Sequence, residues 1–466
     1  MSDYGAFLAA KRWSAPATGI DQVPALHPSL FPFQRDLTAW ALKRGRAAIF
    51  ADTGLGKMRM ELEWARVVAE HTAHPVLILC PLGVRRQIAD EGAAIGLEVT
   101  VCTDGADVRP GVNVTNYDRL QRFVGVRFDG LVLDESSIIK HHDSKTLGAL
   151  LEFAKAIPFR LAGTATPAPN DHTELGTHAE FLGICTRTEM LSEFFCHDGG
   201  ETQVWRLKGH ARKAFYRWLS TWGAMVRLPS DLGYADDGYL LPPLGVEQHL
   251  VSADADTVRR SGTLFAVAAE TLMEQAKARR ASVAARVAAC AEVVAREPGE
   301  AWIVWCDLND ESSALASAIP GAVEVRGSDS AETKERAIDD FRHGRIRVLV
   351  SKPSIFGFGV NLQRCARVAF VGVTHSWEAY YQAVRRCWRF GQTREVQVHL
   401  FSSEVEGNVV ASLARKEGDA RKLSESLSAE TKESVRAQVR GATRESNEYA
   451  PVLTVRVPEW LVSEVG

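Results

Sequence analysis

The chain has 466 residues and a formal net charge of −3, with 24% charged and 46% hydrophobic residues. This length exceeds what one ordinary core organises, so we expect two large lobes. The charge excludes a basic chain that binds nucleic acid over its whole surface, and restricts such binding to a local basic cleft. The sequence shows neither a membrane-spanning stretch nor a secretory signal, so we expect a cytoplasmic protein.

The eight cysteines are scattered and form no CxxC pair. This usage is typical of reduced thiols and not of a disulfide framework. Cys185, Cys196, His197 and His210 lie near one another in sequence, but their spacing matches no common zinc pattern. We therefore expect no zinc site there.

The stretch AIFADTGLGKMRM, Ala48 to Met60, predicts a short strand, a glycine turn and the start of a helix. Glycines let backbone N–H groups close around a phosphate, and a lysine at a helix N-terminus adds positive charge where the dipole already favours an anion. An ordinary glycine-rich β–α turn is the alternative interpretation. The residues predicted to bind ATP here are Thr53, Gly54, Leu55, Gly56, Lys57 and Met58.

Met58 departs from the pattern of such loops, in which Ser or Thr follows the lysine and binds Mg²⁺. A thioether is a poor ligand for a hard cation. Turnover is therefore in question, and a nucleotide switch with little hydrolysis remains open.

Upstream, Gln34 stands between Phe33 and a helical pattern. Its amide could bind the adenine edge while an aromatic ring stacks on the base. A helix-capping role is the alternative.

Apolar strand-like runs alternate with helical segments in both halves of the chain, which favours parallel sheets covered by helices. The predicted strands are 76–80, 99–102, 112–115, 131–135 and 159–164, followed by 302–306, 322–327, 346–352, 368–373 and 396–401.

The strand 131–135 ends in two carboxylates, Asp134 and Glu135. Adjacent acids at the end of a buried strand are costly unless a cation and a reaction require them. We expect Asp134 to bind Mg²⁺ and Glu135 to orient or deprotonate the attacking water.

In the second half, Gln382, Arg386 and Arg389 fall on about one helical face. Arginines that reach toward a γ-phosphate held by the other lobe would stabilise the charge of the transition state. A solvated basic helix is the alternative interpretation.

These runs, in this order, resemble motifs of superfamily-two helicases, and most closely those of the Swi/Snf-type DNA translocases. ADTGLGKM resembles motif I, LVLDESSIIKHHDSKT motif II, and LAGTATPAPN motif III. FPFQRD resembles the Gln motif, CPLGVRRQI motif Ia, VTNYDRL motif Ib, SKPSIFGFGVNLQ motif V and YYQAVRRCWRFGQ motif VI. Ser136 and Ser137 depart from the usual Ala and His of motif II.

The resemblance implies two tandem RecA-like α/β lobes with a helical insertion, and DNA gripped at its phosphates. The residues implied to contact DNA are Thr115, Asn116, Thr164, Thr166, Ser351, Lys352, Gly357, Gly359 and Asn361. The implied divisions are an ATP-binding lobe (1–170), a helical insertion (171–228), a linker (229–248), a C-terminal lobe (249–406) and a tail (407–466).

The function implied is an ATP-dependent DNA helicase or translocase with ATP and Mg²⁺ as cofactors, acting as a monomer in a bacterial or phage-infected cell. The Swi/Snf likeness favours duplex over single-stranded DNA. The insertion is rich in aromatic and basic residues, which predicts either a phosphate-gripping surface or a small helical core with a solvated basic face.

Overall fold

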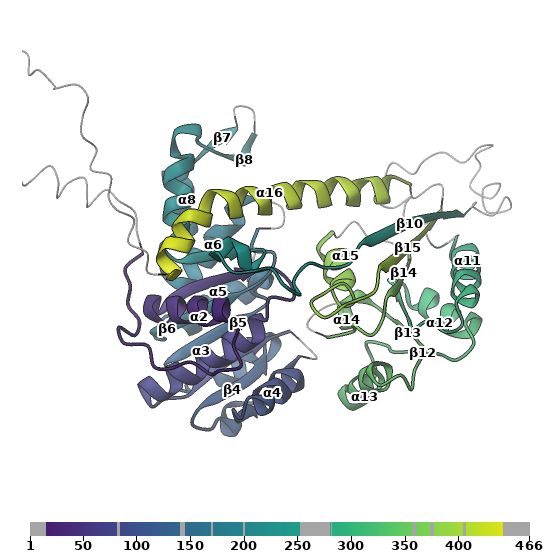
Figure 1. The fold of residues 1–466 in the computed structure, drawn as a ribbon, viewed down its shortest axis with the longest axis horizontal. Coiled ribbons are helices and arrows are strands. Elements are labelled where there is room, and N and C mark those ends of the chain that lie inside the picture. Colours follow the sequence, from purple (N-terminus) through teal and green to yellow (C-terminus); the bar gives the residue numbers. More distant parts are fainter. Residues whose placement is uncertain are drawn as a thin grey trace, which may run out of the picture.

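The computed structural model describes residues 15–81, 84–139, 145–168, 171–198, 201–251, 280, 282–356, 360–372, 377–403 and 407–440. Two α/β lobes lie side by side, one built from the first half of the chain and one from the second (Figure 1). Each lobe contains a parallel sheet, so the predicted fold class of tandem parallel-sheet lobes is confirmed.

The sheet of the first lobe has seven strands in the order β3-β4-β2-β5-β6-β1-β9, and all neighbours are parallel. The strands are β1 (Arg46–Ala51), β2 (Val76–Cys80), β3 (Val99–Val101), β4 (Val112–Asn116), β5 (Gly130–Asp134), β6 (Phe159–Gly163) and β9 (Gly223–Val226). β5 and β1 flank β6, so the acids that end β5 and the loop that follows β1 meet at one edge of the sheet. β9 comes from the segment that was expected to be a helical insertion.

Helices cover both faces of this sheet, and each face has its own apolar cluster. They are α2 (Pro32–Arg44), α3 (Lys57–Thr72), α4 (Arg85–Ala94) and α5 (Lys145–Ala154). Short 3₁₀ segments are η1 (Gly105–Asp107), η2 (Tyr117–Phe123), η3 (Ser136–Ile139), η4 (His172–Glu174), η5 (Gly209–Ala211) and η6 (Pro229–Leu232).

The insertion contains α6 (Leu175–Leu182), α7 (Arg187–Phe194) and α8 (Arg212–Ser220), as expected, but also an antiparallel hairpin, β7 (Phe195–Asp198) and β8 (Glu201–Leu207). Its aromatic side chains pack on one another: Trp218 lies 5.2 Å from Phe194 and 5.8 Å from Phe215 between ring centroids. All three are buried, while Arg212 and Lys213 are exposed. These aromatic side chains therefore form a core, and Arg212 and Lys213 lie outside it.

The second sheet has the order β10-β15-β14-β11-β13-β12 and is also parallel. Its strands are β10 (Leu244–Val251), β11 (Trp302–Cys306), β12 (Ala322–Glu324), β13 (Val348–Ser351), β14 (Arg367–Val371) and β15 (Val396–Ser403). Its helices are α11 (Val283–Arg296), α12 (Asn309–Ala318), α13 (Ala331–Arg342), α14 (Pro353–Phe356) and α15 (Trp377–Val384). β10 was not predicted, and it begins inside the expected linker.

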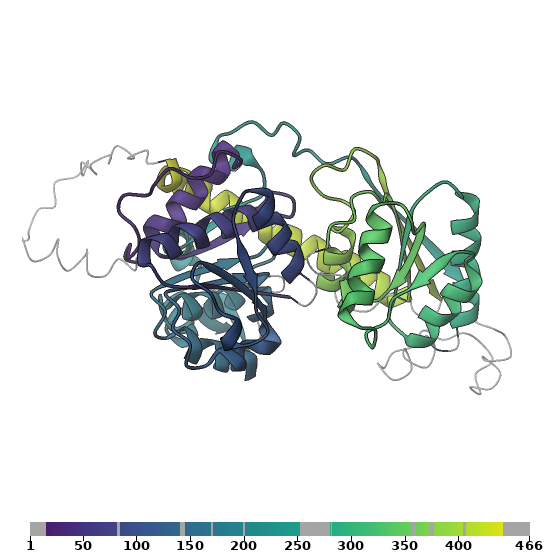
Figure 2. The same cartoon turned by 90° about the horizontal axis from the view of Figure 1, so that it is seen from below.

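The last described helix, α16 (Gly407–Arg440), runs from the second lobe back to the first in both views (Figures 1 and 2). Near its C-terminus Gln438 accepts a hydrogen bond from Arg44 Nη2 at 2.7 Å, and Lys432 lies 3.3 Å from Asp231. The chain therefore connects the lobes twice, through residues 229–243 and through α16. In the described part of the chain, no helix has the length and apolarity that a bilayer crossing requires.

Candidate nucleotide-binding cleft

A cavity of about 400 Å³ lies between the two lobes. Both lobes supply its walls, which are Phe31, Gln34, Thr53, Gly54, Gly56, Lys57, Met58, Arg59, Gln87, Glu91, Asp134, Glu135, Tyr239, Asn361, Gln363, Arg386, Arg389 and Phe390. The structure thus brings most of the predicted catalytic and nucleotide-binding residues to one place. Leu55 is buried beside the cleft and Gln382 is buried behind Arg386.

The loop after β1 has the conformation that a phosphate cradle needs. Gly54 and Gly56 have positive φ values of 97° and 78°, which residues with a Cβ rarely adopt. Lys57 begins α3, and its Nζ donates to the Ala51 carbonyl at 2.8 Å. The loop amides, the helix N-terminus and the lysine therefore converge on one wall of the cavity.

The two acids lie opposite this loop. Asp134 ends β5, and burial together with the neighbouring Glu135 raises its pKa to about 7. Glu135 has a positive φ of 55°, a strained conformation for a residue other than glycine. The Thr164 hydroxyl donates to Glu135 Oε2 at 3.4 Å. Two crowded carboxylates of this kind gain stability from a bound cation.

The arginines enter the cleft from the second lobe. Gln382 on α15 accepts from Arg386 Nη2 at 2.7 Å through its side chain and from Arg386 Nε at 2.9 Å through its carbonyl. Gln382 thus positions Arg386 and does not line the cavity. Burial lowers the pKa of Arg386, and burial together with Arg386 lowers the pKa of Arg389 to about 10.

The second lobe also contacts the phosphate loop directly. Arg385 Nη2 donates to Asp52 Oδ1 at 2.7 Å, and the Tyr381 hydroxyl donates to the same oxygen at 3.0 Å. A Cβ built on Gly54 would lie 2.9 Å from the backbone nitrogen of Phe390. The arginines of one lobe and the lysine and acids of the other therefore face one cavity across a close contact.

Aromatic rings surround the far end of the cavity. Phe31, Tyr239 and Phe390 come from the first lobe, the linker and the second lobe, with centroids 4.7 to 6.4 Å apart. The Gln34 side chain accepts from the Phe31 amide at 2.9 Å and donates to the Leu55 carbonyl at 2.8 Å. Gln34 therefore ties the start of α2 to the phosphate loop, and its amide is already engaged on both sides.

Several of the residues predicted to contact DNA are buried in the first and second lobes. The side chains of Thr115, Asn116, Thr164 and Ser351 are buried. Thr115 donates to the Cys102 carbonyl at 3.0 Å and Ser351 donates to the Val325 carbonyl at 2.9 Å. The Thr164 hydroxyl instead donates to Glu135. All four side chains are buried in this structure, and their contact with DNA stays a prediction.

The remaining members of that set are Thr166, Lys352, Asn361, Gly357 and Gly359. Thr166 is 7% exposed, and its hydroxyl has no hydrogen-bond partner within the described residues. Lys352 is half-buried just after β13. Asn361 lines the inter-lobe cavity instead of an outer surface. Gly357 and Gly359 lie outside the described residues.

Two further ionisable groups near the acids, His178 and Glu61, were not singled out from the sequence. The Ser136 hydroxyl lies 3.1 Å from His178 Nε2 on α6, and both are buried. Glu61 on α3 is buried beside the acids, and burial together with Asp134 raises its pKa well above the usual value. Helical periodicity placed Glu61 on α3, but only the fold shows that it turns toward the acid pair.

The residues present fit a nucleoside triphosphate with a divalent cation. Arg389 Nε is buried without a hydrogen-bond partner among the described residues, which a bound anion would supply. Lys57 and the loop amides provide the other anion contacts, and Asp134 provides a cation ligand. Met58 adds no oxygen ligand, so the protein part of the cation site rests on Asp134.

Residues 285–391 match a family model described as the helicase conserved C-terminal domain. This part of the chain is therefore similar to helicase C-terminal domains. This match spans α11 to the turn after α15 and includes Gln382, Arg386 and Arg389, so it confirms the helicase resemblance of the second lobe. No curated protein matches this chain.

A solved structure described as the Sulfolobus solfataricus SWI2/SNF2 ATPase core in complex with dsDNA is similar to this chain. It aligns over 90% of this chain and 99% of that chain, at 20% identity and a TM-score of 0.42. At this level of likeness the assignment of the helicase domain rests on the family match and on the geometry of the cleft.

Proposed function

We propose that this protein is an ATP-dependent DNA translocase of the Swi/Snf type within superfamily two, and that it hydrolyses ATP in the cleft between its lobes. The observation that carries the proposal is the shared cavity, into which one lobe directs Lys57, Asp134 and Glu135 and the other directs Arg386 and Arg389. A site divided in this way is complete only when the lobes are closed, so hydrolysis and lobe movement are coupled.

Each residue has a distinct role in this proposal. Lys57 and the loop amides hold the β- and γ-phosphates, Asp134 holds Mg²⁺, and Glu135 orients the attacking water and accepts its proton. Arg386 and Arg389 stabilise the charge that develops on the transferred group. Mg²⁺ supplies charge neutralisation between the phosphates, and the rings of Phe31, Tyr239 and Phe390 supply stacking surfaces for the base.

DNA is the proposed substrate for movement because the sequence motifs resemble those of DNA translocases. Lys352 is half-buried just after β13, and a phosphate contact by its ammonium group would be independent of base sequence. Contacts to the DNA phosphates that do not depend on base sequence suit a protein that moves along any DNA.

The test is the rate of Mg²⁺-dependent ATP hydrolysis with duplex DNA, single-stranded DNA and RNA. We expect duplex DNA to stimulate the rate most, and Lys57→Ala to remove the stimulated rate. A triplex-displacement assay beside a forked-duplex assay then separates movement along a duplex from strand separation, and we expect displacement of the third strand without unwinding of the fork.

One observation favours a second function, namely an ATP-gated DNA-binding switch with little turnover. Met58 lines the cavity where a hydroxyl ligand of Mg²⁺ would be expected. A switch would show a hydrolysis rate that DNA does not change, together with DNA affinity that rises when a non-hydrolysable ATP analogue is present.

A further inference from the structure

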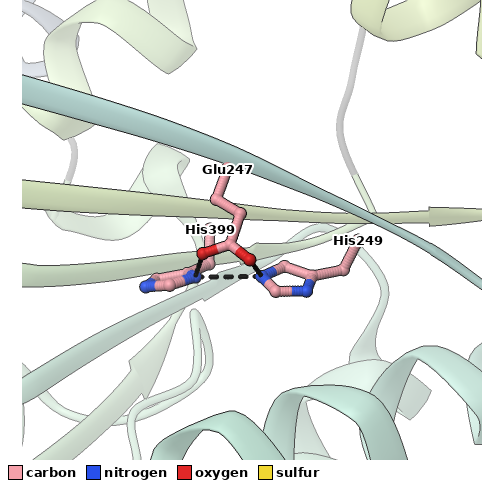
Figure 3. Close-up of side chains that lie close together, drawn as sticks. All are labelled: Glu247, His249 and His399. Carbon is pink, nitrogen blue, oxygen red and sulfur yellow. Dashed lines mark hydrogen bonds and ion pairs between the residues drawn. The ribbon is translucent and has the colours of Figure 1, made fainter.

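Three ligand-type side chains converge at the edge of the second sheet, away from the nucleotide cleft (Figure 3). Glu247 and His249 lie on β10, and His399 lies on β15. Glu247 is the direct register partner of His399, and His249 follows two residues later on the same face of β10. Their ligand atoms all lie within 4.8 Å of one another.

The spacing of these atoms is close to that of a coordination shell. His249 Nε2 lies 2.9 Å from His399 Nδ1, and the carboxylate oxygens of Glu247 lie 3.8 Å and 3.5 Å from these two nitrogens. Around a tetrahedral Zn²⁺ with bonds of about 2.0–2.1 Å, neighbouring ligand atoms lie roughly 3.3–3.4 Å apart. The two carboxylate distances are made by different oxygens, Oε1 toward His249 and Oε2 toward His399. A turn of the Glu247 carboxylate, together with small shifts of the rings, would bring one oxygen to that distance from both nitrogens.

The two imidazoles are held in place by aromatic packing. The His249 ring stacks on Phe401, its register partner, with centroids 4.6 Å apart and an interplanar angle of 11°. The His399 ring packs against Trp302 at 5.3 Å. Side chains fixed in this way lose little freedom when they bind a metal, and the apolar rings shield the inner side of the site from water.

The charges around the three side chains favour a cation. Within the described residues, Glu247 forms ion pairs with the two histidines and with no lysine or arginine. The nearest charged pair, Arg367 and Glu297, is joined by contacts of 2.7 Å and 3.2 Å, so the arginine is neutralised by its own partner. His399 is buried and Glu247 is 61% exposed at its side chain, which leaves the site open to solvent on one side.

We propose that Glu247, His249 and His399 bind a divalent transition metal of the zinc class, with water in the fourth position. Two imidazoles and one carboxylate favour Zn²⁺ or Co²⁺ over Mg²⁺, which prefers oxygen ligands. The ion would fasten β10, the edge strand that receives the linker from the first lobe, to β15. It is independent of the proposed ATP site, because none of its ligands lines the nucleotide cavity.

The experiment uses the full chain, stripped with EDTA and kept reduced, and titrates it with ZnCl₂ by calorimetry and with CoCl₂ by visible absorption. We expect one equivalent of each metal to bind and the cobalt complex to show tetrahedral d–d bands without a thiolate charge-transfer band. His249→Ala and Glu247→Gln should each weaken binding at least tenfold. His343→Ala is the matched control, because His343 has an acidic neighbour, Asp339 at 3.0 Å, but lies outside the cluster.

Thermal unfolding keeps the test valid if a variant folds poorly. Zinc should raise the melting temperature of the wild type and of His343→Ala but not that of His249→Ala. The metal-free Glu247→Gln protein should melt at the same temperature as the metal-free wild type, because the Glu247 side chain is exposed. Three results would each overturn the proposal. They are no metal binding by the wild type, unchanged binding in His249→Ala, and a thiolate–cobalt band in the cobalt complex.

Discussion

Arg385 of the second lobe donates a hydrogen bond of 2.7 Å to Asp52 of the first, directly beside the phosphate loop. The arginine is 8% exposed at its side chain and the aspartate 26%. Arg385 also lies over the ring of Trp388 at 4.8 Å, and Trp388 donates to the Pro242 carbonyl of the linker at 2.7 Å. One ion pair thus joins the phosphate loop to the turn after α15, and through Trp388 to the linker. Arg386 and Arg389 lie in this turn and not on a continuous helix with Gln382, which corrects the expected helical face.

Asp52→Asn should shift the lobes toward an open arrangement. The change leaves Arg385 buried without its anionic partner, which costs more than the loss of a surface ion pair. We expect a longer mean distance between dyes placed on α4 and α13 in energy-transfer measurements, and a several-fold higher KM for ATP. Arg345→Gln, which breaks an exposed ion pair within the second lobe, is the control and should change neither value. Equal distances in Asp52→Asn and wild type would refute the role given to this contact.

Arg386→Ala should lower kcat by about a thousandfold or more with little change in KM, because arginine fingers act mainly on the transition state. Gln382→Ala should have a smaller effect in the same direction, about tenfold, because Gln382 only positions the guanidinium. Arg394→Ala, an exposed arginine of the same lobe that pairs with Glu300, serves as the control. A change confined to KM in the Arg386 variant would contradict the assignment.

Met58→Thr tests whether the missing hydroxyl limits turnover. A threonine at this position adds an oxygen ligand, so we expect half-maximal ATP hydrolysis at a lower Mg²⁺ concentration. Met58→Leu preserves the apolar packing of Met58 without adding a ligand and should behave like the wild type. Identical Mg²⁺ dependence in the threonine and leucine variants would show that the cation site does not reach this residue.

His178 should make the first lobe sensitive to acid. Burial lowers its pKa to about 4, whereas an unfolded chain has a value of roughly 6.5. The unfolded state therefore binds more protons below pH 6.5, and the stability of the fold should fall as the pH drops from about 6.5 to about 4, by up to about 3 kcal/mol. Urea denaturation at several pH values should show this loss, and the difference between wild type and His178→Gln should depend on pH within that window. A constant difference would contradict the shift.

Much of the fold could be predicted from the sequence because the strands are short apolar runs between helical segments. Every predicted strand lies in one of the two sheets, and the phosphate loop and the acid pair were recognised by local spacing. β10 escaped prediction because it is a half-exposed edge strand with Glu247, Gln248 and His249 at its centre, so it lacks the apolar pattern of the inner strands.

Contacts between distant segments could not be read from the sequence. Nothing near Tyr239 or Phe390 indicates that they meet Phe31, since three separate parts of the chain must fold first. The buried hydroxyls of Thr115 and Ser351 follow from their places on inner strands, where the backbone of a neighbouring strand or loop takes up the polar group. The convergence of Glu247, His249 and His399 likewise depends on the parallel register of β10 and β15.

The central claim is that Glu135 activates water at a triphosphate held between the two lobes. The most direct test compares wild type and Glu135→Gln for binding of a fluorescent ATP analogue and for single-turnover hydrolysis with duplex DNA. The account predicts nearly equal dissociation constants and a hydrolysis rate at least a hundredfold lower in the variant, since general bases contribute about 10²–10⁴-fold. A Glu135→Gln protein that hydrolyses ATP at the wild-type rate would contradict it.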